Sequence, residues 1–167
     1  MTTTRIEISK SYLHFAAAHF TIFSASNREN LHGHNFQVAL DATAEIGEDG
    51  LTFDYNVLKD ALMALCDELD EQVLMPKNSP HLSFDQDGDY TVVCFADERI
   101  PFLPRDLTIL PVRNITVEEM AAYLLDKLRA RPEIEELSLN HLELKCASGQ
   151  GQWAVATYNY TGQGDQP

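Results

Sequence analysis

The chain has 167 residues, of which 26 are acidic and 12 are Lys or Arg, so its formal net charge is −14. Proteins that bind nucleic acid or lie on anionic membranes need clustered Lys and Arg, and this composition therefore argues against nucleic acid and membrane as partners. With 44% hydrophobic and 23% charged residues the chain can bury a core, and its length suits one domain that spans residues 1–167.

The cysteines and the apolar runs bear on localisation. The three cysteines form no Cys-x-x-Cys pair, and an odd number does not suit a disulfide framework. The first twenty residues lack the basic segment and apolar core of an export signal, and every apolar run is too short to cross a bilayer. The sequence thus predicts a soluble protein of the reducing cytoplasm.

The first predicted elements are the two strands of a long antiparallel hairpin. Residues 5–20 and 34–46 are rich in alternating apolar, aromatic and β-branched side chains, with turn-forming Ser and Asn between them. Asp54 can then cap a helix that runs up to Pro76. The apolar residues of this helix recur at helical spacing: Leu58, Leu62, Leu65, Leu69 and Val73.

The middle of the chain is predicted to be an inserted β excursion at about residues 75–113. This stretch holds five prolines around two short strand-like runs, residues 90–95 and 107–110. Thr116 and Glu119 then form a capping box, in which each side chain reaches the backbone amide of the other residue. A second helix is therefore expected to begin after Thr116.

The last part of the chain predicts a second hairpin, because residues 137–146 and 153–160 carry alternating apolar side chains on either side of a Gly-Gln-Gly turn. The predicted order is two strands, a helix, the insertion, a helix and two strands. This order lacks the strand–helix–strand alternation of a doubly wound fold, so we expect an α+β domain with an antiparallel sheet. The polar tail at residues 162–167 is expected to fray.

Three of the six histidines carry the strongest chemical signal. His32 and His34 lie two residues apart at the start of the second strand, so both imidazoles point to one face. His19 ends the preceding strand, and the hairpin can bring it alongside. Three neutral imidazoles with a fourth position open to water or substrate match a catalytic zinc site. Taken alone, the pattern also fits a surface His-Gly-His turn and a structural histidine at position 19.

Five spaced segments closely resemble signatures of the 6-pyruvoyl-tetrahydropterin synthase and 6-carboxy-tetrahydropterin synthase superfamily. The resemblance covers the chain except for the insertion and the tail. The five segments are FAAAHF at 15–20, ENLHGHNF at 29–36, LTFD at 51–54, LD at 69–70 and ITVE at 115–118.

The resemblance implies the tunnelling fold, in which each subunit provides a four-stranded antiparallel sheet and two helices. Three subunits of such a protein close a twelve-stranded barrel, two trimers usually stack into a hexamer, and the pterin sites lie between subunits. The resemblance further implies that His19, His32 and His34 bind Zn²⁺. A small-molecule pterin is the implied substrate, and a homo-oligomer is the implied assembly.

The residue that would act as the base departs from the commonest pattern of the family. Members that make pyruvoyl- or carboxy-tetrahydropterin have a proton-transferring cysteine four residues before the His-x-His motif, where this chain has Arg28. Glu29 instead resembles a branch in which glutamate replaces that cysteine. Members of the branch are associated with cleaving the side chain of 7,8-dihydroneopterin or its triphosphate to 6-hydroxymethyl-7,8-dihydropterin. Glu29 is therefore the predicted base, and the alternative is a solvated loop carboxylate.

Further departures concern the other catalytic and substrate-binding positions. The family's catalytic histidine after Leu-Asp is Glu71 here, so Asp70 and Glu71 are catalytic candidates or else ordinary helix surface. The pterin-anchoring glutamate of the third strand corresponds to Cys146, and a thiol cannot accept two N–H groups as a carboxylate does. Glu118, together with Thr116 at the start of the second helix, is the candidate for binding the pterin edge.

Three other side chains are secondary candidates. Arg28 and Lys145 are the nearest cations for a triphosphate, and His141 is a candidate for the missing general acid.

The favoured function is a zinc-dependent pterin side-chain lyase of folate or tetrahydropterin biosynthesis. One alternative is a zinc-bearing pterin-binding homologue that has lost turnover. The other is a 6-carboxy-tetrahydropterin synthase of deazaguanine biosynthesis, which needs the absent cysteine.

Overall fold

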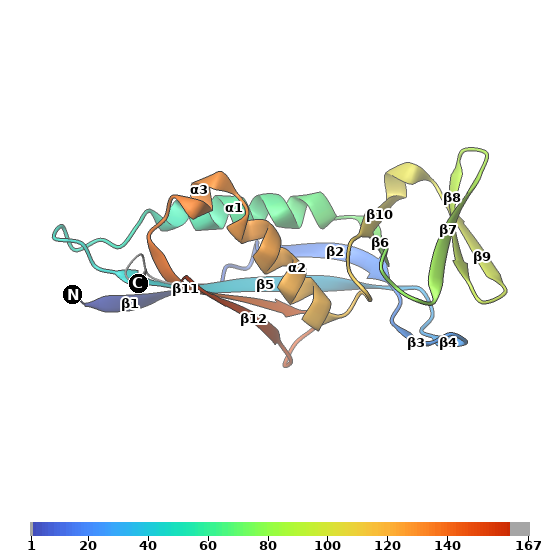
Figure 1. Cartoon of the computed structure of the whole chain (residues 1–167), viewed down its shortest axis with the longest axis horizontal. Helices are drawn as coiled ribbons and strands as arrows, with labels where there is room; N and C mark the ends of the chain where they lie inside the picture. Colours follow the sequence, from blue (N-terminus) through green and yellow to red (C-terminus); the bar gives the residue numbers. More distant parts are fainter. Residues whose placement is uncertain (1, 161–167) are drawn as a thin grey trace, which may run out of the picture.

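The computed structural model describes residues 2–160 (Figure 1), so the tail that was expected to fray lies outside the described residues. The main sheet is built around β5 (His32–Glu45), a strand of 14 residues. β1 (Thr3–Ile8) and β2 (His14–His19) pair with β5 one after the other, and both pairings are antiparallel. The first predicted strand is thus broken into two pieces that share one partner.

The second predicted hairpin is confirmed and completes a five-stranded antiparallel core. β11 (Leu139–Ala147) pairs with the other edge of β5, and β12 (Ala154–Asn159) pairs with β11. Because side chains alternate along each strand, the two faces of this core differ sharply. The face that carries Leu142 and Leu144 is fully buried.

Two parallel strands extend this core, so the prediction of a purely antiparallel sheet was wrong at one edge. β6 (Gln72–Pro76) pairs in parallel with β2, and β10 (Leu107–Leu110) pairs in parallel with β6. The sheet is therefore mixed and has seven strands. Two hydrogen bonds of 2.7 Å hold the chain at the edge of β2. The Ala16 amide donates to the Asp70 carboxylate, and the Glu71 amide donates to the Ala16 carbonyl.

Three helices cover one face of the sheet (Figure 1). α1 (Tyr55–Leu69) is capped by Asp54, as predicted, but it ends before Val73, which lies in β6. α2 (Val117–Arg129) is followed by the single turn α3 (Pro132–Glu135).

The predicted capping box of α2 is formed only in part. The Thr116 hydroxyl accepts from the Glu119 amide at 3.4 Å. The Glu119 carboxylate does not complete the box, because it accepts from the amide and the guanidinium of Arg113 instead.

The main core lies between the sheet and the helices. Phe15 and Phe36 stack with their ring centroids 4.9 Å apart on the inner face of β2 and β5. The helices contribute rows of leucines at helical spacing, and most of them are completely buried: Leu58, Leu62, Leu65, Leu69, Leu124, Leu125 and Leu128.

Residues 75–113 hold a separate small sheet at one end of the molecule (Figure 1). Its strands are β7 (Leu82–Asp87), β8 (Tyr90–Phe95) and β9 (Glu98–Phe102), all antiparallel. The predicted strands at 90–95 and 107–110 are confirmed as β8 and β10, which follows the short helix η1 (Pro104–Asp106).

A second apolar cluster joins this small sheet to the end of β2. Its buried members come from three parts of the chain: Phe20, Ile22, Met75, Leu82, Val93 and Phe95. The hairpin of β3 (Ile22–Ser24) and β4 (Asn27–Arg28) lies beside the cluster and leads into β5.

The face of the sheet opposite the helices carries polar and small side chains. Asp41 in β5 is 1% exposed and binds Arg5 of β1 at 2.8 Å and Lys145 of β11 at 2.5 Å. The sheet of the single chain is open, so the implied closure of three subunits into a barrel stays a prediction. Between residues 2 and 160, the helices are all too short or too polar to cross a membrane.

Candidate metal and substrate site

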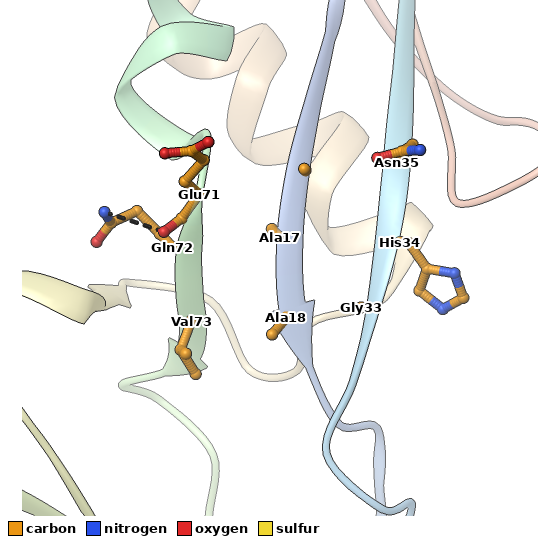
Figure 2. Close-up of a pocket in the computed structure, with 9 residues that line it drawn as sticks. Ala17, Ala18, Gly33, His34, Asn35, Glu71, Gln72 and Val73 are labelled. Atoms are coloured by element: carbon orange, nitrogen blue, oxygen red, sulfur yellow. Dashed lines mark hydrogen bonds between the residues drawn. The ribbon is translucent and has the colours of Figure 1, made fainter.

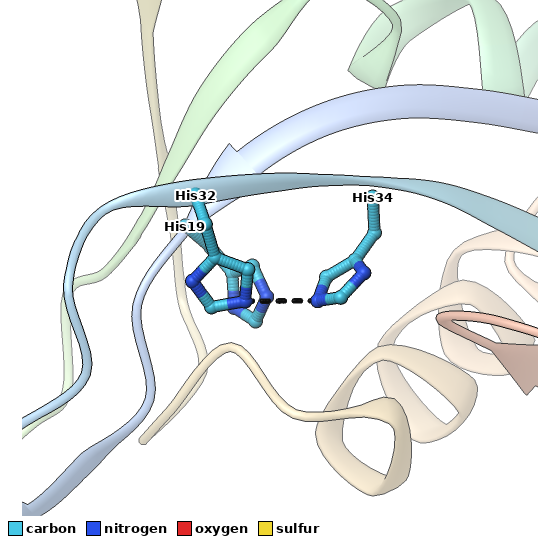
Figure 3. Close-up of side chains that lie close together, drawn as sticks. All are labelled: His19, His32 and His34. Atoms are coloured by element: carbon cyan, nitrogen blue, oxygen red, sulfur yellow. Dashed lines mark hydrogen bonds between the residues drawn. The ribbon is translucent and has the colours of Figure 1, made fainter.

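Three histidines meet at the end of the β2–β5 pair (Figure 3). His19 and His32 are direct partners in the antiparallel register, and His34 follows on the same face of β5. The ring centroids lie 4.7, 4.8 and 5.2 Å apart. One nitrogen from each ring can be chosen so that all three lie within 4.8 Å of one another. The predicted convergence of the imidazoles is thus present in the structure.

The burial of His19 suits a metal ion. His19 is 5% exposed, and its two buried ring nitrogens have no hydrogen-bond partner among the described residues. Burial lowers the pKa of His19 to about 4, with further lowering by His32 and His34, so the ring is neutral at pH 7. Three close imidazole nitrogens and an orphaned buried ring fit Zn²⁺, which would relieve the cost of that burial.

A hydrogen bond from His32 to a backbone carbonyl orients one of the three imidazole rings. His32 Nδ1 lies 2.8 Å from the Asn30 carbonyl, which only a protonated Nδ1 can donate to. The Nε2 of His32 is thereby left as the ligand atom, and it lies 2.9 Å from Nε2 of His34. A backbone carbonyl that fixes the tautomer is typical of histidine ligands.

The three rings open into a cavity of about 410 Å³. Among the residues predicted for substrate or catalysis, Glu29, Thr116 and Glu118 line it. Thr116 caps α2 and Glu118 lies in the first turn of that helix, so α2 points its N-terminus at the site.

Sequence reasoning missed three polar residues of the cavity wall. Thr21 follows β2, and Ser148 and Gln152 belong to the β11–β12 turn. The signal for the last two was the Gly-Gln-Gly turn itself, because the pairing of β11 with β5 carries that turn toward the histidine end of the sheet.

Glu29 is held firmly beside the histidines. The Thr21 amide donates to Oε2 of Glu29 at 2.9 Å, and the Glu29 amide donates to the Thr21 carbonyl at 2.9 Å. Partial burial would raise the pKa of Glu29, but the bond from Thr21 and the nearby His32 and His19 hold that pKa below its ordinary value. The side chain is therefore an ionised carboxylate at neutral pH, as a general base requires.

Asp70 and Glu71 are not brought to this cavity within one chain. Asp70 accepts the Ala16 amide at the end of α1, and Glu71 lines a second cavity of about 380 Å³ with Asn35 and Val73. In Figure 2 the ring of His34 points away from the side on which Glu71 lies. Asp70 and Glu71 thus lie outside the histidine cavity of their own chain, and their catalytic role stays a prediction.

Cys146 does not line the cavity either, which corrects its assignment to substrate binding. It is fully buried in the main core, and burial raises the pKa of its thiol to about 12, with a smaller contribution from Cys66. The alternation along β11 explains the place of Cys146, because residues 142, 144 and 146 all face the helices.

The remaining candidates also have other partners. The guanidinium of Arg28 pairs with Glu98, and Lys145 binds Asp41 on the open face of the sheet. His141 lies 2.6 Å from the Asn159 side chain on that same face. None of these three residues is among those that line the histidine cavity.

The sequence of this chain is similar to that of known proteins. The family model for 6-pyruvoyl tetrahydropterin synthase matches residues 7–158. A Methanocaldococcus jannaschii protein named as a candidate 6-carboxy-5,6,7,8-tetrahydropterin synthase is 25% identical over 144 residues, which cover 85% of this chain and 88% of that protein.

Solved structures extend the similarity to the fold. The 6-pyruvoyl tetrahydropterin synthase of Plasmodium vivax is 27% identical, with a TM-score of 0.88 and coverage of 96% of this chain and 100% of that chain. A catalytic-residue mutant of the same enzyme, in which a glutamate is replaced by alanine, is 26% identical with a TM-score of 0.89 and the same coverage.

Proposed function

Because the chain belongs to the 6-pyruvoyl tetrahydropterin synthase family, we propose that it is a zinc-dependent lyase that shortens the side chain of a reduced pterin. The substrate is 7,8-dihydroneopterin or its triphosphate, and the product is 6-hydroxymethyl-7,8-dihydropterin. The observation that carries the proposal is the position of Glu29, an ionised carboxylate anchored by Thr21 in the same cavity as the three histidines.

Proton transfer is the work assigned to Glu29. It takes the proton from the second hydroxyl of the trihydroxypropyl side chain, and that carbon becomes the carbonyl of a departing two-carbon aldehyde. The carbon–carbon bond to the first side-chain carbon breaks, and its electron pair is delocalised into the dihydropterin ring. Protonation of the first carbon then leaves a hydroxymethyl group. When bound by His19, His32 and His34, Zn²⁺ would polarise a side-chain oxygen and favour this loss of a proton.

The pterin ring is assigned to the start of α2. Its amino-pyrimidinone edge presents adjacent N–H groups, which a carboxylate accepts with two oxygens. Glu118 lines the cavity and takes this role in our proposal, with Thr116 beside it.

Similarity to the P. vivax enzyme supports the use of a glutamate. That protein shares at least 26% of its sequence with this chain, and one of its solved forms replaces a catalytic glutamate. The 6-carboxy alternative has the M. jannaschii relative in its favour. It needs a cysteine at the site, however, and Cys66, Cys94 and Cys146 are all absent from the cavity wall.

The proposal is tested by giving the zinc-loaded protein dihydroneopterin and its triphosphate separately. Oxidation and fluorescence chromatography should then show hydroxymethylpterin. Substrate that binds but is returned unchanged would instead indicate a homologue without turnover. A carboxy-tetrahydropterin product would indicate the synthase.

Metal content is measured on the same preparation. The protein purified without chelator should hold about one zinc ion per chain, and His34→Ala should lose most of it. His141→Ala is the matched control, because His141 lies on the opposite face of the sheet and should leave the zinc content unchanged. Full zinc retention in His34→Ala would refute the assigned ligands.

A further inference from the structure

Arg28 occupies a confined position between the β3–β4 hairpin and the small inserted sheet. Its side chain is 15% exposed. The guanidinium lies over the ring of Phe20, 4.5 Å from the centroid, and 5.7 Å from the centroid of Phe95. Phe20 directly follows the histidine at position 19, and Phe95 ends β8. Two aromatic rings therefore hold the plane of the guanidinium in place.

The hydrogen bonds of Arg28 join the insertion to the backbone of Glu29. Nε of Arg28 donates a hydrogen bond of 2.8 Å to Oε2 of Glu98, which lies at the start of β9. Nη1 of Arg28 donates a hydrogen bond of 2.7 Å to the backbone carbonyl of Glu29. The same guanidinium thus contacts an insertion residue and the main chain of the proposed base.

Glu29 is consequently restrained on both sides of its α-carbon. The Arg28 guanidinium holds its carbonyl, and Thr21 binds its amide and its carboxylate. A general base must lie within hydrogen-bond reach of the proton that it removes, and displacement of a reacting group by about 1 Å can lower a rate by about 10²-fold. Restraint of this carbonyl therefore bears directly on proton transfer.

We propose that Arg28 is a positioning residue for Glu29, and that the inserted sheet acts in the reaction by holding Arg28 through Glu98. The inference rests on the proposed function of Glu29. It also gives the insertion, which adds no residue to the wall of the histidine cavity, a part in turnover. Lysine cannot replace this arginine, because an ammonium group lacks the planar fork that stacks on Phe20 while it donates in two directions.

The test compares Arg28→Lys and Glu98→Gln with the wild-type holoenzyme. Both variants should lower kcat about tenfold, with KM within twofold of wild type and with unchanged zinc content, because the restraint acts on the base rather than on binding. Arg99→Lys is the matched control. Arg99 neighbours Glu98 in β9 but pairs with the exposed Asp85 at 3.1 Å, so its kcat should stay within twofold of wild type.

A second comparison separates positioning from general support of the fold. In a Glu29→Gln background, Arg28→Lys should cause no further loss of the residual rate, because there is no carboxylate left to position. A tenfold loss in that background as well would overturn the proposal. Wild-type kcat in Arg28→Lys would overturn it directly.

Amide hydrogen exchange keeps the proposal testable without turnover. Peptides within residues 20–30 should exchange faster in Arg28→Lys and Glu98→Gln than in wild type, and at the wild-type rate in Arg99→Lys. If wild-type protein converts neither dihydropterin, the lyase function fails, and the exchange rates still decide whether Arg28 restrains Glu29. Unchanged exchange in both variants refutes the restraint whatever the activity.

Discussion

Single residues determine the chemistry of the site, and some of them are readable from the sequence. The His-x-His spacing on a strand predicts two rings on one face, and the register of the hairpin adds the third ring. Cys146 shows the limit of such reading. Its position follows from the alternation of β11, but which face of that strand is covered by helices depends on packing between distant parts of the chain.

Glu29→Gln tests the proposed base. Glutamine keeps the size of the side chain and can still accept the Thr21 amide, but it cannot take a proton. Turnover of dihydroneopterin should fall about 10²- to 10⁴-fold, with zinc content and substrate binding close to wild type. Steady-state rates, metal analysis and a binding titration check this. Wild-type turnover would show that Glu29 is only a loop carboxylate.

Asp41→Asn tests the charge network on the open face. Burial works against the ionised form of Asp41, but Arg5 and Lys145 hold its pKa below the ordinary value. The folded protein therefore binds this proton less readily than the unfolded chain. The stabilisation by Asp41 is complete above the unfolded pKa of about 4 and is lost as the pH falls through the lower folded value.

The expected result follows from the lowered pKa of Asp41 in the folded protein. At pH 7 the asparagine variant should be less stable by about 2 kcal/mol, because two charged hydrogen bonds are weakened. Urea unfolding at pH 7 and near pH 3 should show a smaller gap between the variant and wild type at the acid pH. A gap of the same size at both pH values would contradict the role of Asp41.

Secondary structure elements were predicted best where a local signal starts them. Both caps at Asp54 and Thr116 lie at the first turns of their helices. The end of α1 was predicted wrongly because Val73 continues the apolar spacing, whereas backbone bonds from β2 direct the chain into β6. Such an end depends on a strand more than fifty residues earlier, which no local pattern can reveal.

Asp54→Ala should destabilise α1 without changing the histidine cavity, which Asp54 does not line. The Asp54 carboxylate accepts from the Asn56 amide at 2.9 Å, and loss of an N-cap typically costs about 1 kcal/mol. We expect a Tm that is lower by a few degrees and unchanged turnover. Asp54→Ser, which keeps an acceptor, should recover most of the loss, and an alanine variant with the wild-type Tm would contradict the capping role.

At the scale of the whole molecule, one face of the main sheet has no helices over it, and the outer edge of β12 pairs with no other strand between residues 2 and 160. Val155 in β12 is 50% exposed and Trp153 beside it is 43% exposed. Unpaired edges with apolar side chains are rare in monomers because they pair with other chains. The overall topology beyond the five-stranded antiparallel core, and how the chains assemble, therefore depend on contacts that local sequence patterns do not record.

We expect the protein to form a trimer or a hexamer in solution. Light scattering should give a mass near three or six times 18.8 kDa. Val155→Asp, which places a charge on the free edge, should shift that mass toward the single chain, whereas Tyr90→Asp in the distant inserted sheet should not. A monomer at micromolar concentration would contradict the assembly.

The backbone of Glu71 has a φ of 57°, in the left-handed region, which costs a non-glycine residue about 1 kcal/mol. Selection for thermostability alone should therefore replace this glutamate by glycine or asparagine, which adopt that conformation readily. Glu71→Gly should be at least as stable as wild type in thermal unfolding. If the Glu71 carboxylate takes part in catalysis in the site of a neighbouring subunit, the same variant should lose turnover. Stability and activity would then oppose each other at position 71.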